Sequence, residues 1–131
     1  MKKILLRIII IFAVVSLVGF CGYKCYYNNK KIIGDKIIEI TGIWYGKDIT
    51  ISEIAQIEKI VEQLNLMKKN YQIVPKTTNH SPDSMIYFVD ENGNTQRVEF
   101  YGEYIMICDV GQFKVDNTAV STWGHTFFDT I

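Results

Sequence analysis

The chain has 131 residues, enough for one domain, and its 14 lysines and arginines balance its 14 aspartates and glutamates. The balance hides an asymmetry: residues 1–31 carry six bases and no acids, whereas residues 32–131 carry eight bases and fourteen acids, a net charge of −6. An acidic domain is a poor nucleic-acid binder, because the phosphate backbone attracts lysine and arginine. Three cysteines are too few for a disulfide framework.

The N-terminal residues 4–23 are an apolar run with a single charge, Arg7. A twenty-residue helix is about 30 Å long, which matches the hydrocarbon core of a bilayer. Tyr23, Tyr26 and Tyr27 stand at its far end, and tyrosine is favoured at the membrane–water interface. We expect residues 1–23 to be a single-pass transmembrane helix that acts as a signal-anchor.

Two alternatives to a retained anchor stay open. In a lipoprotein a small residue precedes the modified cysteine, but here Phe20 precedes Cys21 and Lys24 precedes Cys25. A signal peptidase site needs small residues one and three positions before the cut, and Gly19 with Cys21 is only a weak pair. An uncleaved, unlipidated span is therefore the favoured interpretation.

Basic residues flank the span almost equally, three before it and three after it, so charge alone does not orient it. A short charged N-terminal tail is the usual start of a signal-anchor. We therefore expect a protein of the cell membrane whose C-terminal domain lies outside the cytoplasm. Residues 24–35 are expected to form a polar tether, and residues 36–131 the domain.

The domain opens with residues 36–44, which are β-branched and partly alternating and so predict a strand, followed by a turn over residues 45–48. Thr50 and Glu53 match a capping box, which predicts an amphipathic helix over residues 51–69. Large apolar residues recur there at helical spacing: Ile54, Ile57, Ile60, Val61, Leu64 and Met67.

Short β-prone runs joined by tight turns follow the helix and predict an antiparallel meander: residues 84–90, 95–101, 104–109 and 112–115. The first turn contains Asn92-Gly93, a strong hairpin signal. Residues 71–74 are a candidate extra strand, and residues 75–83 a loop that holds both prolines. We expect the helix to pack through Ile54, Ile57, Val61 and Leu64, with Glu58 and Glu62 pointing away. The expected receiving face of the meander is Val98, Phe100, Ile105 and Ile107.

The tail holds Val120, Trp123, Phe127 and Ile131 at helical spacing, which indicates a short closing helix. The sequence as a whole predicts an α+β fold: an N-terminal transmembrane helix, then one amphipathic helix packed on an antiparallel meander, with a short C-terminal helix.

A basic start, an apolar span, a strand, a "TIS-E-I-x-x-I" helix and "D-x-x-G" hairpins follow one another in this chain. This pattern resembles small membrane-anchored or lipoprotein extracytoplasmic domains of unknown function from Gram-positive bacteria. The architecture is also similar to cystatin-like and PepSY-like domains. The resemblance implies an envelope location and a binding role, and it transfers no catalytic residue.

Candidate chemistry is sparse. Neither His80 nor His125 has partners at metal-ligand spacing, and residues 90–94 fit a hairpin better than a calcium loop. Cys108 lies in an expected strand beside Ile107, which favours a buried thiol over a nucleophile. We therefore expect no enzyme, no cofactor and no metal site, and an enzyme with an unrecognised site is the runner-up interpretation.

Aromatic residues are the remaining lead, because they exceed what a small core needs. Five of them are candidate partner-binding residues: Trp44, Tyr45, Tyr87, Tyr101 and Tyr104. The strand at residues 84–90 has two apolar faces, and its second face is covered either by the closing helix or by a partner. The expected function is a module that binds a protein or an envelope component, as an immunity or inhibitor protein or as an accessory subunit of a membrane complex.

Overall fold

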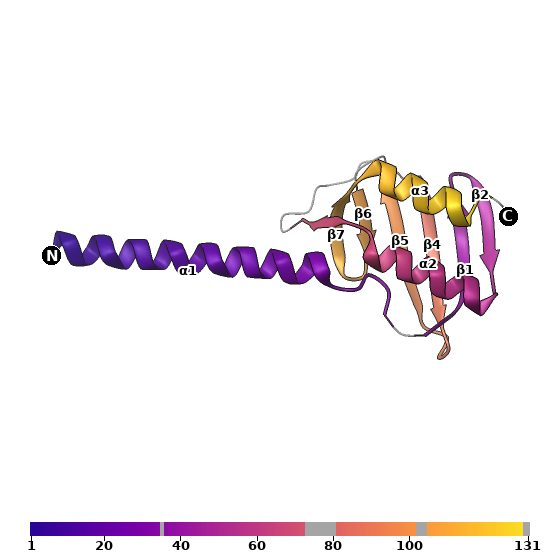
Figure 1. Cartoon of the computed structure of the whole chain (residues 1–131), viewed down its shortest axis with the longest axis horizontal. Coiled ribbons are helices and arrows are strands. Elements are labelled where there is room, and N and C mark those ends of the chain that lie inside the picture. Colours follow the sequence, from indigo (N-terminus) through magenta and orange to yellow (C-terminus); the bar gives the residue numbers. More distant parts are fainter. Residues whose placement is uncertain (35, 73–80, 102–104, 130–131) are drawn as a thin grey trace.

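The computed structural model of the chain describes residues 1–34, 36–72, 81–101 and 105–129. Figure 1 shows one long helix projecting from a compact α+β unit. The helices are α1 (Lys2–Asn29), α2 (Ile54–Leu66) and α3 (Asn117–Phe127). The strands are β1 (Ile37–Trp44), β2 (Lys47–Ile51), β3 (Lys69–Tyr71), β4 (Ser84–Asp90), β5 (Thr95–Tyr101), β6 (Ile105–Cys108) and β7 (Gly111–Val115).

The strands form one seven-stranded sheet in the order β2-β1-β4-β5-β6-β7-β3, and every neighbouring pair is antiparallel. Both α2 and α3 pack on the same face, which we call the inner face (Figure 1). The opposite, outer face is covered by neither helix. The predicted α+β class is confirmed, including the N-terminal apolar helix and the short C-terminal helix.

The alternation of β4 explains how the sheet presents its two faces. Ile86 and Phe88 are fully buried on the inner face, whereas Met85, Tyr87 and Val89 are half-buried on the outer face. Successive side chains of a strand point to opposite faces, so the inner set joins the core and the outer set does not.

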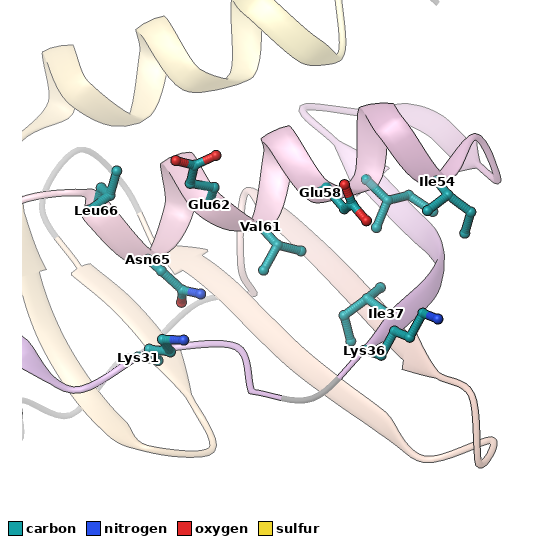
Figure 2. Close-up of a pocket in the computed structure, with 10 residues that line it drawn as sticks. Lys31, Lys36, Ile37, Ile54, Glu58, Val61, Glu62, Asn65 and Leu66 are labelled. Atoms are coloured by element: carbon teal, nitrogen blue, oxygen red, sulfur yellow. The ribbon is translucent and has the colours of Figure 1, made fainter.

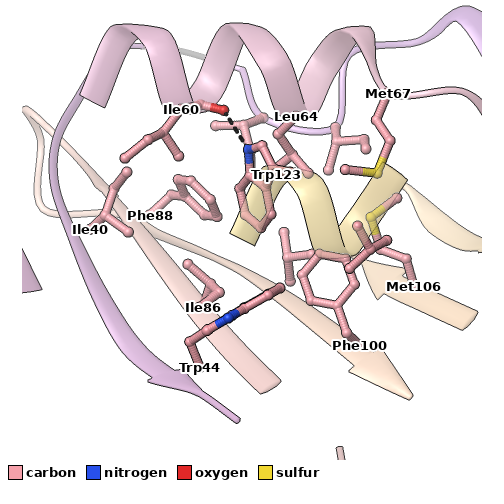
Figure 3. Packing of buried hydrophobic residues seen from close by; sticks show 14 of the residues in the cluster. Ile40, Trp44, Ile60, Leu64, Met67, Ile86, Phe88, Phe100, Met106 and Trp123 are labelled. Atoms are coloured by element: carbon pink, nitrogen blue, oxygen red, sulfur yellow. Dashed lines mark hydrogen bonds between the residues drawn. The ribbon is translucent and has the colours of Figure 1, made fainter. Parts of the chain in front are cut away.

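The core joins the sheet to both helices (Figure 3). Trp123 of α3 donates from Nε1 to the Ile60 carbonyl of α2 at 3.2 Å, so the two helices are tied by a buried hydrogen bond. The Trp123 ring also meets Trp44 and Phe128, with centroid distances of 5.8 and 5.0 Å. A buried indole needs a partner for its N–H, and Ile60 provides it. The short closing helix is therefore part of the core.

The predicted capping box is wrong. Thr50 lies exposed in β2, and α2 begins at Ile54 after Glu53, which makes no side-chain capping bond. Residues 47–51 pair with β1 instead, through a hairpin whose turn residues Tyr45 and Gly46 both have positive φ, 45° and 79°. Two positive φ values are typical of a type I′ turn, and the hairpin buries Ile49 and Ile51.

The predicted buried face of the helix is partly wrong. Ile57 and Leu64 are buried as expected, but the third buried residue is Ile60. Ile54 is 42% exposed and Val61 is half-buried, so both lie at the edge of the buried stripe. The prediction placed the centre of the stripe too far toward Val61, because it did not anticipate that α3 covers α2 beside Ile60.

The helix and strand boundaries also differ at the C-terminal end of α2. The helix ends at Leu66, and Lys69 opens β3, which pairs with β7. The extra strand predicted at residues 71–74 thus exists but starts earlier, and residues 73–80 of the predicted strand and loop lie outside the described residues.

The predicted inner face of β6 is wrong by one residue. Met106 is fully buried opposite Phe100, whereas Ile107 is half-buried opposite Glu99 on the outer face. The described side chains do not include Ile105. Residues directly opposite in an antiparallel pair share a face, so pairing Phe100 with Met106 fixes this register.

Gly124 sits where α3 crosses Trp44, and a Cβ at this position would overlap the indole ring. We expect Gly124→Ala to destabilise the domain by about 1–3 kcal/mol, since overpacking outweighs the gain of about 1 kcal/mol in helix propensity. Urea unfolding of the full chain, followed by tryptophan fluorescence, measures the change. A stabilised Gly124→Ala variant would show that α3 does not pack on Trp44.

Candidate functional site

The segment after α1, part of the predicted polar tether at residues 24–35, packs against the domain. The α1 helix continues to Asn29, and Ile32 and Ile33 are each only 2% exposed within the core. Asn65 of α2 accepts from the Ile33 amide at 2.9 Å and donates to the Ile33 carbonyl at 3.0 Å. Gln96 makes the same two-bond contact with Gly34, at 3.2 Å each way. The segment is thus fixed along the domain, beside α2.

A groove of about 330 Å³ lies between α2 and this segment, and we call it the α2 groove (Figure 2). Val61 and Asn65 point from the helix toward the strand side, where Lys31 and Ile37 lie. The lining side chains come from both walls: Lys31, Lys36, Ile37, Ile54, Ile57, Glu58, Val61, Glu62, Asn65 and Leu66.

The α2 groove has an apolar floor and two walls of opposite charge. Its floor is made by aliphatic residues such as Ile37 and Val61. Lys31 and Lys36 stand on one wall, and Glu58 and Glu62 stand on the helix. Within the described part of the chain no ion pair joins the two walls. These charges are therefore available to groups of a bound molecule.

A wider hollow of about 760 Å³ lies between α2 and α3. Its walls carry several polar side chains, including Thr118, Thr122 and Thr126. Leu66, 71% exposed, borders both this hollow and the α2 groove. The α2 groove is the stronger candidate, because two lysines and two glutamates frame its apolar floor, whereas the charged residues lining the hollow are one lysine and one aspartate, Lys59 and Asp116.

The structure separates the five aromatic residues that the sequence singles out. Trp44 is 5% exposed in the core, so little of its ring is accessible to a partner. Trp44 lies on the inner face of β1, where its ring packs against Trp123 of α3. Tyr45 is 53% exposed in the β1–β2 turn. Tyr87 and Tyr101 are half-buried on the outer face, and Tyr104 lies outside the described residues.

The outer face mixes apolar and charged side chains. Arg97 and Tyr101 both contact Glu99, at 3.0 Å from Nε to Oε1 and at 2.7 Å from the hydroxyl to Oε2. Ile43, 47% exposed, lies beside Met85. Neither Tyr87 nor Tyr101 lines the α2 groove. Sequence reasoning missed the groove. The signal for it is that α2 carries more apolar residues than its buried face needs, because Ile54 and Val61 lie beside the buried face.

Among the residues that the structure describes, the titratable candidates form no recognisable reactive set. Burial raises the pKa of the Cys108 thiol, whose sulfur donates to the Gly111 carbonyl at 3.6 Å, so the thiol is protonated and weakly nucleophilic at neutral pH. His125 pairs with Asp129 on the surface at the end of α3, and His80 lies outside the described residues. No group of three metal-ligating side chains occurs in the described residues.

The Asn65 bonds to Ile33 close the end of the α2 groove nearer to α1. Asn65→Ala leaves two part-buried backbone groups without partners, so we expect a loss of about 1–3 kcal/mol in unfolding free energy. Asn65→Asp keeps the acceptor for the Ile33 amide and should lose less. Hydrogen exchange at the Ile33 amide measures the local effect. Unchanged exchange in Asn65→Ala would contradict the two-bond contact.

No protein-family model, curated protein or solved structure matches this chain.

Proposed function

We propose that the chain is a single-pass membrane protein whose α+β domain binds a segment of a partner protein in the α2 groove. The α1 helix is long and apolar enough to span a membrane, and none of its residues is buried in the domain. The proposed role is that of an accessory subunit of a membrane complex, with the domain outside the cytoplasm. No catalytic set is assigned.

The observation that carries the proposal is the apolar surface that α2 leaves outside the core. Ile54 and Leu66 are 42% and 71% exposed at the two ends of the groove, and Val61 lies between them. An exposed apolar strip rimmed by charged groups is typical of a protein-binding surface. The facing lysines and glutamates favour a peptide that carries charges of both signs.

The position of the groove favours a partner that is itself in the membrane. Lys31, at one end, follows the last residue of α1 by only two positions. A segment of another membrane protein that leaves the bilayer beside α1 would therefore reach the α2 groove directly at its Lys31 end. Ile54 and Lys36 mark the end of the groove farther from α1 (Figure 2).

Site-specific photo-crosslinking in native membranes tests this proposal. A photoreactive phenylalanine analogue at Ile54 or Val61 should give one crosslinked product of discrete mass. The matched control carries the analogue at Thr50, which is exposed on the outer face of β2, and should give none. Glu58→Lys combined with Glu62→Lys should weaken the crosslink at Val61 about tenfold or more, since each reversal of a charge opposite a partner charge costs binding energy.

Two results would contradict the proposed site. Equal crosslinking from Thr50 and Val61 would indicate non-specific contact. Crosslinking from Thr50 with none from Ile54 or Val61 would place the partner on the outer face of the sheet instead.

A further inference from the structure

The end of the domain next to α1 carries an unusual concentration of positive charge. Residues 67–72 and 111–115, which build β3 and β7, contain three lysines and no acidic residue, although residues 32–131 have a net charge of −6. Asp109 and Asp116 flank β7 and are the acids closest to it in sequence. The opposite end of the domain, at β1, β2 and the start of α2, carries Glu39, Asp48, Glu53 and Glu58 (Figure 1).

This end contacts the last turns of α1. The ring of Tyr71 on β3 stacks on Tyr27, with centroids 4.3 Å apart and planes at 17°, and it meets Tyr23 edge-on at 5.8 Å. The Tyr71 amide donates to the Asn28 side-chain oxygen at 2.5 Å. Strand β3 therefore lies at the level of residues 23–28 of α1.

That level is the headgroup region when residues 4–23 span the hydrocarbon core. Four tyrosine rings cluster there: Tyr23, Tyr26, Tyr27 and Tyr71. Lys30 lies over two of them, with its Nζ 5.8 and 5.7 Å from the centroids of Tyr26 and Tyr27. Rings with a polar edge, accompanied by lysine, suit the boundary between acyl chains and headgroups.

We propose that this end is a docking surface for anionic phospholipid headgroups, which hold the domain upright on the membrane. We call its lysines the basic collar: Lys24, Lys30, Lys31, Lys68 and Lys114. The last four are exposed and Lys24 is half-buried. The proposal rests on α1 spanning a membrane, and it adds a second binding partner, the lipid surface, to the proposed function.

Lys68 and Lys114 decide the energetics of docking. Lys24, Lys30 and Lys31 follow the span directly, so they stay near the headgroups whether or not the domain is docked. Lys68 and Lys114 belong to the β3–β7 end, and Lys114 lies opposite Asn70 of β3. They approach the lipid only in the docked arrangement. Attraction of lysine to an anionic surface therefore favours docking through these two residues.

Docking also fixes how the α2 groove meets a partner. The helix α2 ends next to β3, so its C-terminal end lies toward the membrane and its start lies away from it (Figure 1). An upright domain holds the groove in one orientation relative to the bilayer. Lipid charge thereby controls the presentation of the groove, and it meets the groove lining only at Lys31.

Hydrogen exchange of the full chain in nanodiscs tests the docking, with the Tyr71 amide as the reporter, because its hydrogen-bond partner Asn28 belongs to α1. Exchange should be about tenfold or more slower in discs containing phosphatidylglycerol than in discs of phosphatidylcholine alone. Added salt should reduce the difference. Soluble glycerol phosphate added to phosphatidylcholine discs should not reproduce it. Asn28→Ala should accelerate Tyr71 exchange in both lipids and so validates the reporter.

Lys68→Glu and Lys114→Glu, each alone, should reduce the lipid effect about fivefold or more, whereas Lys59→Glu, an exposed lysine on α2, should retain it. Equal Tyr71 exchange in the two lipids would overturn the docking and leave both the span and the α2 groove standing. A loss as large in Lys59→Glu as in Lys114→Glu would also overturn it, because general charge would then suffice. A chain that does not incorporate into the discs would overturn the span and the docking together.

Discussion

Trp44→Ala is expected to destabilise the domain by about 3–5 kcal/mol, a large part of the stability of a domain of this size. The Trp44 ring is 5% exposed and lies within 6 Å, centroid to centroid, of four other rings: Tyr45 at 4.9 Å, Phe100 at 5.9 Å, Trp123 at 5.8 Å and Phe128 at 5.2 Å. Its removal opens a cavity between the sheet and α3. Urea unfolding of the full chain measures the loss, with Trp123 as the remaining fluorophore.

The matched control is Ile43→Ala, one residue earlier on the same strand. Ile43 is 47% exposed on the outer face, so its truncation should cost within about 1 kcal/mol. If Trp44→Ala is as stable as Ile43→Ala, Trp44 is not a core residue, and a partner-binding role for it is favoured.

Leu64→Ala is expected to cost about 2–5 kcal/mol, because Leu64 is fully buried between α2 and the sheet. Glu62→Ala, on the exposed side of the same helix, should change the unfolding free energy by no more than about 0.5 kcal/mol. The contrast depends on the orientation of α2 about its axis. The same unfolding experiment measures both variants.

Similar losses at Leu64 and Glu62 would show that the buried face of α2 is assigned wrongly. A companion pair refines the test, since Ile60 is fully buried while Ile54 is 42% exposed. Ile60→Ala should therefore cost more than Ile54→Ala, although the sequence prediction names Ile54 and not Ile60 among the four residues through which the helix packs.

Much of the sheet is predictable because its signals are local. Strands β4 and β5 occupy the predicted residues 84–90 and 95–101, joined by the turn that contains Gly93 at a φ of 83°. Alternation and a turn with positive φ depend only on neighbouring residues, so a sequence pattern captures them. The closing helix α3 is predictable for the same reason, from apolar residues at helical spacing.

The errors arise where distant contacts outweigh a local pattern. Thr50 and Glu53 form a plausible capping box, yet residues 47–51 gain more by pairing with β1 and burying Ile49. The sequence predicts a polar tether around Ile33. In the structure the side chain of Asn65, 32 residues later, hydrogen-bonds to the Ile33 backbone. Sequence spacing contains no information about such partners.

The candidate site was the least predictable part. The sequence directs attention to aromatic residues, but Trp44 belongs to the core. The α2 groove depends on the path of residues 31–37 beside α2, which no local pattern specifies. The basic collar likewise depends on a distant contact. The pairing of β7 with β3 places Lys114 opposite Asn70, and so on the same end of the domain as Lys68.

The central claim is that α1 remains attached as a membrane anchor and holds the domain at the bilayer surface. Mass spectrometry of carbonate-washed membranes tests it most directly, through the tryptic peptide of residues 8–24, which contains most of the apolar run and Cys21. We expect this peptide intact, with an unmodified Cys21, in the membrane pellet. A protein whose first residue is a diacylglycerol-modified Cys21, or a domain recovered in the wash without residues 8–24, would contradict the claim.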